Sequence, residues 1–244
     1  MIDLIAQKEI RRVNLGALGR PHGIAFADGK VYFTAEASRK IARYDPADDK
    51  VDWVFETGQD TTHMLVISRD RNAMFTSDIG SDTISAIYRT SSNAEWNHVA
   101  IHVDQGPEAT DLSPDGKEVW TAHSGDGGIS IIDVGARRVV QTLNIQTQRS
   151  NRLKFTPDGN IALVSEAGEL VVLDRATRKV VKRLKVGRSP EGIVIEPIGL
   201  RAFVATASDN GVVVIDLKTL TVAKRIATGS GPTAWPGWSG DSSD

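Results

Sequence analysis

A repeat of about 42 residues limits the folds open to this chain more than any other sequence feature. The segments PEATDLSPDG, from position 107, and SNRLKFTPDG, from position 150, show it most clearly. Equivalent units begin at Pro21, Thr62, Pro107, Ser150, Pro190 and Pro232, at spacings of 41, 45, 43, 40 and 42 residues. Each unit divides into short β-rich runs, such as 118–122 and 211–215, and none contains an amphipathic helical pattern. A period of this size with four short strands is typical of propeller blades.

We therefore expect an all-β protein, a β-propeller of four-stranded antiparallel blades with five full blades and a composite or incomplete sixth. Residues 1–4 match residues 214–217, so the chain begins near the end of a third strand, and a fourth strand is expected at Ile10–Leu15. The last unit stops soon after Pro232. Two interpretations fit these ends: a six-bladed ring with one defective blade, and a fragment of a seven-bladed ring. The start in the middle of a unit favours the fragment. Residues 1–238 are predicted to be one propeller domain and 239–244 a flexible tail.

Two sets of recurring residues have structural interpretations. The aspartates that end the third strands are expected to accept backbone N–H groups and set the next turn: Asp45, Asp133, Asp174 and Asp216. The bulky residues that share one position of the second strand are expected to pack within the blades: Phe33, Phe75, Trp120, Leu163 and Phe203.

Composition excludes several classes of protein. With 29 Lys+Arg against 31 Asp+Glu, the formal charge is −2, so the chain lacks the basic surface that nucleic acid requires. No run approaches the roughly 18 apolar residues of a membrane span, and the first residues lack the charged and apolar segments of an export signal. The absence of cysteine excludes disulfides and thiolate chemistry. Phosphate-binding loops, nucleophile elbows and the zinc-protease motif are also absent.

Polar residues recur where each unit should open onto the mouth of the central channel. The second position of the units holds His22, His63, Glu108, Asn151, Glu191 and Thr233. The end of the second strand holds Glu36, Asp78, His123, Glu166 and Thr206. Arg152 stands where other units have a small residue or methionine, and Arg20 directly precedes the first unit. Equivalent positions of successive blades point toward one axis. The candidate ligand-binding residues are therefore His22, Glu36, His63, Asp78, Glu108, His123, Asn151, Arg152, Glu166 and Glu191.

Three interpretations of this ring remain open. His22, His63 and His123, with Glu36 or Asp78, could hold a divalent metal, since imidazole and carboxylate groups suit such ions. Carboxylate and histidine pairs could perform general acid–base chemistry, as in a lyase. The preferred interpretation is a hydrated polar funnel whose side chains hydrogen-bond to neighbouring blades or bind a partner loop. Arg152 then makes either an anion contact or, as preferred, an ion pair with Glu108, Glu166 or Glu191.

The segments SPDGKEVWTA (113–122) and VIDLKTLTV (214–222) resemble the YVTN-type repeat of YncE-like β-propellers. The likeness extends from Met1 to about Trp235, and the first unit, PHGIAF with VYFTAE, also resembles repeats of virginiamycin B lyase propellers. The resemblance implies a periplasmic or extracytoplasmic setting. We expect a monomeric, non-catalytic scaffold whose mouth binds a protein or a small molecule, without a membrane span and with no cofactor beyond a possible divalent metal. The alternative is a metal-assisted lyase or hydrolase at the same mouth.

Overall fold

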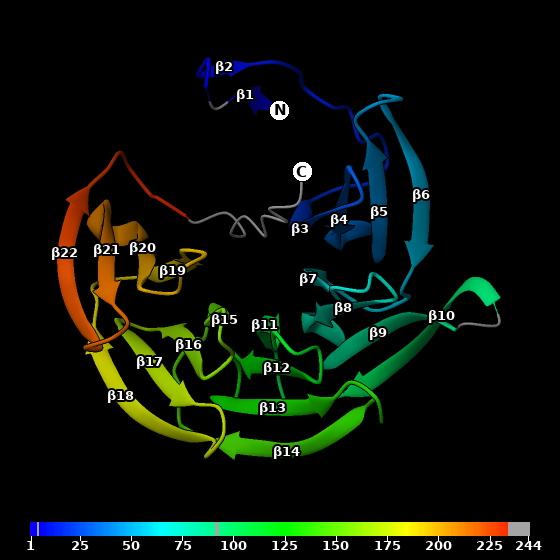
Figure 1. Cartoon of the computed structure of the whole chain (residues 1–244). Helices are drawn as coiled ribbons and strands as arrows, with labels where there is room; N and C mark the ends of the chain where they lie inside the picture. Colours follow the sequence, from blue (N-terminus) through cyan, green and yellow to red (C-terminus); the bar gives the residue numbers. More distant parts are fainter. Residues whose placement is uncertain (4, 91–92, 234–244) are drawn as a thin grey trace.

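The computed structural model describes residues 1–3, 5–90 and 93–233, and in them the chain forms blades around a central axis (Figure 1). There are five four-stranded antiparallel sheets and one two-stranded sheet in these residues. Blade 1 comprises β3 (Pro21–Ala27), β4 (Lys30–Ala35), β5 (Lys40–Asp45) and β6 (Lys50–Glu56). Blade 2 comprises β7 (Thr62–Ile67), β8 (Ala73–Asp78), β9 (Thr83–Thr90) and β10 (Asn93–His102).

The other three blades repeat this order. Blade 3 comprises β11 (Pro107–Leu112), β12 (Glu118–His123), β13 (Gly128–Asp133) and β14 (Arg138–Asn144). Blade 4 comprises β15 (Arg152–Phe155), β16 (Ile161–Glu166), β17 (Glu169–Asp174) and β18 (Lys179–Lys185). Blade 5 comprises β19 (Pro190–Ile195), β20 (Arg201–Thr206), β21 (Gly211–Asp216) and β22 (Thr221–Ala227). Short 3-10 turns follow three second strands: η1 (Glu36–Ser38), η2 (Ile79–Ser81) and η3 (Ala207–Asp209). The predicted all-β propeller class with four-stranded antiparallel blades is confirmed.

Strand register places the candidate residues at one end of the blades. The first residue of an inner strand pairs with the end of the second strand, as in Pro21 with Ala35, Thr62 with Asp78 and Pro107 with His123. The inner strands β3, β7, β11, β15 and β19 surround the centre of the ring (Figure 1). Side chains at these strand ends can therefore meet across neighbouring blades.

The aspartates that end the third strands set turns as predicted. Asp45 accepts a hydrogen bond from the N–H of Ala47, and Asp133 accepts one from Ala136. Asp174 and Asp216 accept in the same way from the residues three positions later.

The N-terminal residues form a two-stranded sheet, β1 (Ile2–Asp3) with β2 (Lys8–Glu9). Asp3 accepts from the N–H groups of Ile5 and Ala6, so it occupies the third-strand end, as the match to residues 214–217 predicts. The fourth strand predicted at Ile10–Leu15 is wrong, because the strand that pairs with β1 is Lys8–Glu9. In the segment that follows, Ile10 donates its N–H to the carbonyl of Met1, and Val13 and Leu15 pack on the core of blade 1. The predicted last inner strand shows no strand at Pro232 or Thr233, and its continuation and the tail at 239–244 lie outside the described residues.

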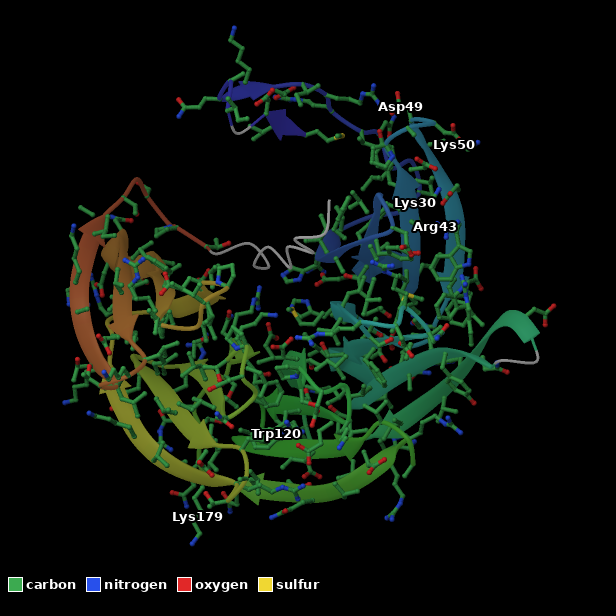
Figure 2. All side chains as sticks on the ribbon, viewed as in Figure 1. Lys30, Arg43, Asp49, Lys50, Trp120 and Lys179 are labelled. Atoms are coloured by element: carbon green, nitrogen blue, oxygen red, sulfur yellow. The ribbon has the colours of Figure 1, made fainter. Side chains whose placement is uncertain are left out.

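Buried apolar side chains fill each blade and the spaces between blades. Trp120 is fully buried among the strands of blade 3, and its ring meets that of Phe155 in blade 4 edge to face at 5.4 Å (Figure 2). Phe33, Phe75 and Leu163 are also buried, whereas Phe203 is only partly so. In contrast, Lys179 lies exposed on the outer strand of blade 4 (Figure 2).

Blade 1 also carries a charged cluster on its outer strands, labelled in part in Figure 2. The carboxylate of Asp52 accepts from Lys30 Nζ at 2.7 Å and from Arg43 Nε at 2.7 Å, and Lys30 also pairs with Asp45. These partners lower the pKa of Asp52 to about 2, the hydrogen bond from Arg43 contributing most. We call these four residues the blade 1 ion cluster.

Among the described residues, no helix has the length and apolar character needed to cross a membrane.

Candidate functional site at the channel mouth

His63 is the centre of a polar network at the channel mouth. It is the second residue of β7, and its side chain is 9% exposed. Its Nδ1 contacts Glu36 Oε1 from blade 1, and its Nε2 lies 3.0 Å from Glu108 Oε1 of blade 3. One histidine therefore links three blades.

A glycine allows His63 to approach blade 1 this closely. A Cβ atom on Gly23 would lie 2.4 Å from the carbonyl oxygen of His63 and 2.7 Å from the amide nitrogen of Leu65. The Thr34 hydroxyl donates to the His63 carbonyl at 2.6 Å and accepts from the N–H of Gly23 at 2.7 Å. Backbone contacts between β3 and β7 thus set the position of His63 independently of the hydrogen bonds of its side chain.

Two arginines complete the network. Arg20 Nη2 lies 3.0 Å from Glu36 Oε2, and Arg152 Nη1 lies 3.9 Å from Glu108 Oε1. Arg152 also donates to the backbone carbonyl of Asn151 at 2.7 Å. Burial lowers the pKa of Arg152, although the charges of Glu108 and Glu191 oppose this. The preferred interpretation of Arg152 as an ion-pair residue fits its placement beside Glu108.

Burial alone would raise the pKa of Glu108, but its neighbours reverse the shift. The hydrogen bond from His63 and the positive charges of His63 and Arg152 bring the pKa below its ordinary value. Glu108 is therefore an ionised carboxylate at neutral pH.

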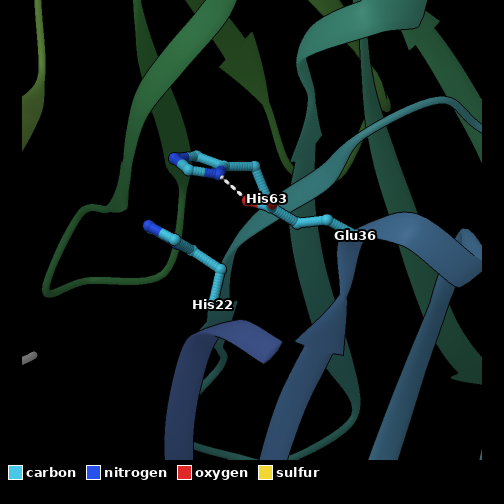
Figure 3. A group of neighbouring side chains, drawn as sticks. All are labelled: His22, Glu36 and His63. Atoms are coloured by element: carbon cyan, nitrogen blue, oxygen red, sulfur yellow. Dashed lines mark hydrogen bonds and ion pairs between the residues drawn. The ribbon is translucent and has the colours of Figure 1, made fainter. Parts of the chain in front are cut away.

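His22 lies over the ring of His63, as Figure 3 shows. The two ring centroids are 3.8 Å apart and the planes differ by 25°. The residue is exposed at the mouth, yet loss of water from the stacked ring, followed by the charges of His63 and Arg152, lowers its pKa to about 4. His22 is therefore a neutral imidazole at pH 7. One donor atom from each of His22, Glu36 and His63 lies within 4.8 Å of the others, which is a spacing that could hold a metal ion.

Asp78 does not join this group. It is fully buried, and its carboxylate accepts from the hydroxyls of Ser85 at 2.7 Å and of Thr76 and Thr83 at 3.2 Å. All four residues belong to blade 2, so the side chain faces the interior of its own blade. Burial raises the pKa of Asp78 to about 6, and the hydroxyl donors only partly oppose the shift.

The structure does not place His123 with the other two histidines of the predicted metal set. Its buried ring donates from Nδ1 to Asp126 Oδ1 at 2.9 Å, and these two form a separate group with Asp104. Asp126 was not among the predicted site residues. The glycine-rich loop at 124–128 was the sequence signal that could have indicated Asp126, because a tight loop can bring its own side chain back to the strand that precedes it.

The remaining predicted site residues lie around the mouth but outside the His63 network. Glu166 accepts from the N–H of Gln148 at 2.6 Å and from Arg183. The side-chain oxygen of Asn151 is buried, with no hydrogen-bond partner among the described residues. Glu191 acts on the site through the charge that it presents to Arg152.

Comparison with known proteins supports the class of fold that this geometry defines. A family model described as YNCE-like beta-propeller matches residues 3–198, so the chain belongs to the YncE-like β-propeller family. A search of curated proteins finds no match.

Solved structures share the fold at low sequence identity. Hydrazine synthase of Kuenenia stuttgartiensis superposes with a TM-score of 0.82 at 20% identity, covering 95% of this chain and 81% of that one. Virginiamycin B lyase of Staphylococcus aureus superposes with a TM-score of 0.74 at 15% identity, covering 90% and 75%. Identities this low establish the architecture but not an activity.

Proposed function

We propose that the protein is a non-catalytic β-propeller that binds a protein loop or a small polar molecule at its channel mouth. The observation that carries this proposal is the convergence of polar and charged side chains from four blades. Blade 1 supplies His22 and Glu36, and the next three blades supply His63, Glu108 and Arg152 in turn. Rings of blades commonly bind ligands where equivalent loops meet, because a rigid scaffold positions them.

The pairing within this network favours recognition over catalysis. A general acid or base must reach a proton on the substrate. Both nitrogens of His63 already face carboxylates, and the two oxygens of Glu36 face His63 and Arg20. Side chains that hold one another in this way present a fixed pattern of donors and acceptors, which suits selective binding.

Screening for a ligand followed by matched substitutions tests this function. The purified protein would be screened by thermal shift against dicarboxylates, amino acids, sugars and nucleotides, and for peptide partners against a displayed peptide library. Hits would be titrated by calorimetry with Arg152→Gln and Glu108→Gln, and with Lys179→Gln as the control on the outer strand. We expect the two mouth variants to weaken binding at least tenfold and the control to leave it unchanged. Equal binding by all variants would place the ligand elsewhere and refute the proposal.

A metal-assisted lyase or hydrolase at the same mouth is the second candidate function. The specific observation in its favour is the spacing of His22, Glu36 and His63. The fold shared with virginiamycin B lyase of Staphylococcus aureus is a reason to include lyase substrates in the assay. Conversion of a bound compound, detected by mass spectrometry and abolished by a chelator, would select this function over simple binding.

A further inference from the structure

We propose that His22, Glu36 and His63 form a three-ligand site for a divalent cation of the zinc class. Two imidazoles with one glutamate and a water molecule form a common zinc coordination set. Ligand atoms bound tetrahedrally at about 2.1 Å lie about 3.4 Å from one another. The three donor atoms here lie within 4.8 Å of one another, so they can reach that spacing once the ring of His22 turns. The site goes beyond the proposed binding function and does not depend on it.

The surroundings of His63 provide a second and independent observation. Zinc-bound histidines characteristically donate their other ring N–H to a carboxylate, which fixes the ring and its tautomer. Glu108 occupies this position, 3.0 Å from His63 Nε2. Its hydrogen bond leaves Nδ1 directed at Glu36, where the cation would bind.

The second oxygen of Glu36 is also held in place. Arg20 lies 3.0 Å from Oε2, so Oε1 is the oxygen that faces His63. A cation between Nδ1 and Oε1 replaces the hydrogen that now joins them, and that proton passes to solvent. Glu108 and Arg20 are therefore positioning residues, one for each buried ligand.

His22 must move for the site to close. Its ring is nearly parallel to that of His63, whereas a cation binds imidazole nitrogen close to the plane of each ring (Figure 3). The residue is exposed at the mouth, so its ring can turn out of the stack without disturbing the core. The open coordination position then faces the channel.

The group formed by Asp104, His123 and Asp126 has a similar spacing but a different environment. Asp126 Oδ1 accepts from His123 Nδ1 and from the N–H of Gly128, and Oδ2 accepts from the N–H of Gln105. These bonds order the loop and commit both carboxylate oxygens. The group therefore serves as the comparison site in the experiment.

Calorimetric titration of the chelator-treated full chain with ZnCl₂ tests the proposal. We expect saturable binding of one equivalent, with the dissociation constant raised at least tenfold in His22→Gln and in Glu36→Gln. His102→Gln is the matched control, because His102 is exposed on the outer strand β10. His22→Gln changes an exposed side chain, so it tests the site without threatening the fold.

Two further variants separate this site from its alternatives. Glu108→Gln should weaken zinc binding by roughly 10–100-fold if the residue positions His63. Asp126→Asn should leave zinc binding unchanged. Absence of saturable binding, equal affinity in His22→Gln and Glu36→Gln, or loss of binding in Asp126→Asn alone would each overturn the proposal. Because zinc is the only probe, these outcomes are independent of whether the mouth binds an organic ligand.

Discussion

Replacing the buried carboxyl of Asp78 should change how the stability of the protein depends on pH. Asp78 is fully buried, and burial raises its pKa from 3.8 to about 6. Between these two values the folded protein holds a proton that the unfolded chain has released. The stability contributed by this group is therefore fully present below pH 4 and is lost as the pH rises through 6.

The size of the effect follows from the shift. A pKa difference of about two units between the folded and unfolded states lowers the free energy of unfolding by on the order of 3 kcal/mol at neutral pH. Asparagine cannot ionise and retains an oxygen for the Ser85 hydroxyl, while its amide group forfeits a hydrogen bond at a cost of about 1 kcal/mol. Asp78→Asn should therefore be about 2 kcal/mol more stable than the wild type at pH 7, and about 1 kcal/mol less stable at pH 4.

Urea unfolding of both proteins, followed by tryptophan fluorescence from pH 4 to pH 8, measures this difference. His98 Nε2 lies 2.9 Å from Ser85 Oγ, which in turn contacts Asp78, so a change at Asp78 can affect the titration of His98. His98 is present in both proteins. Burial lowers the pKa of His98 below its ordinary value, and this shift is common to both proteins. A stability difference that does not change with pH, or that grows in favour of the wild type as the pH rises, would refute the reasoning.

Three other substitutions probe the core, the ion cluster and the close approach of blades. Trp120→Ala removes a fully buried ring and should lower the free energy of unfolding by about 3–5 kcal/mol, measured by urea titration. Asp52→Asn breaks the blade 1 ion cluster and should make the protein less stable than the wild type at pH 7. Because the pKa of Asp52 is lowered to about 2, the difference in stability between the two proteins should disappear as the pH falls from 4 toward 2 in the same assay. Gly23→Ala places a Cβ against the His63 carbonyl and should destabilise the fold by about 1–3 kcal/mol, whereas Gly229→Ala, where nothing lies within 4 Å of the added Cβ, should not impose that clash. Thermal unfolding of the two glycine variants distinguishes these outcomes, and equal melting temperatures would contradict the packing explanation.

The fold could be predicted in detail because the repeat encodes local structure. The unit starts at Pro21, Thr62, Pro107 and Pro190 are also the first residues of inner strands. The fourth strand near the N-terminus lies at Lys8–Glu9 and not at the predicted Ile10–Leu15, since apolar residues such as Val13 and Leu15 can pack on blade 1 and imitate the alternation of a strand.

The candidate site was only partly predictable, because the repeat register does not tell where a side chain points. The register predicts Glu36 at the position of Asp78, but Pro21 pairs with Ala35 as Thr62 pairs with Asp78, so Glu36 lies one residue further on, at the start of η1, where its side chain reaches His63 in the next blade. Asp78 is the last residue of its second strand and turns to the hydroxyls of its own blade. His123 occupies this position in blade 3 and meets Asp126 from its own loop. The shorter turn between β3 and β4 and the nearest loop decide these contacts, and neither has the period of the repeat.

Anomalous diffraction at the zinc edge, from crystals grown with ZnCl₂, tests most directly the claim that the channel mouth is one convergent site. We predict a peak bounded by His22, Glu36 and His63, with Glu108 still bonded to the far nitrogen of His63. A map with no peak at the mouth, or with zinc only beside Asp126, would contradict this account.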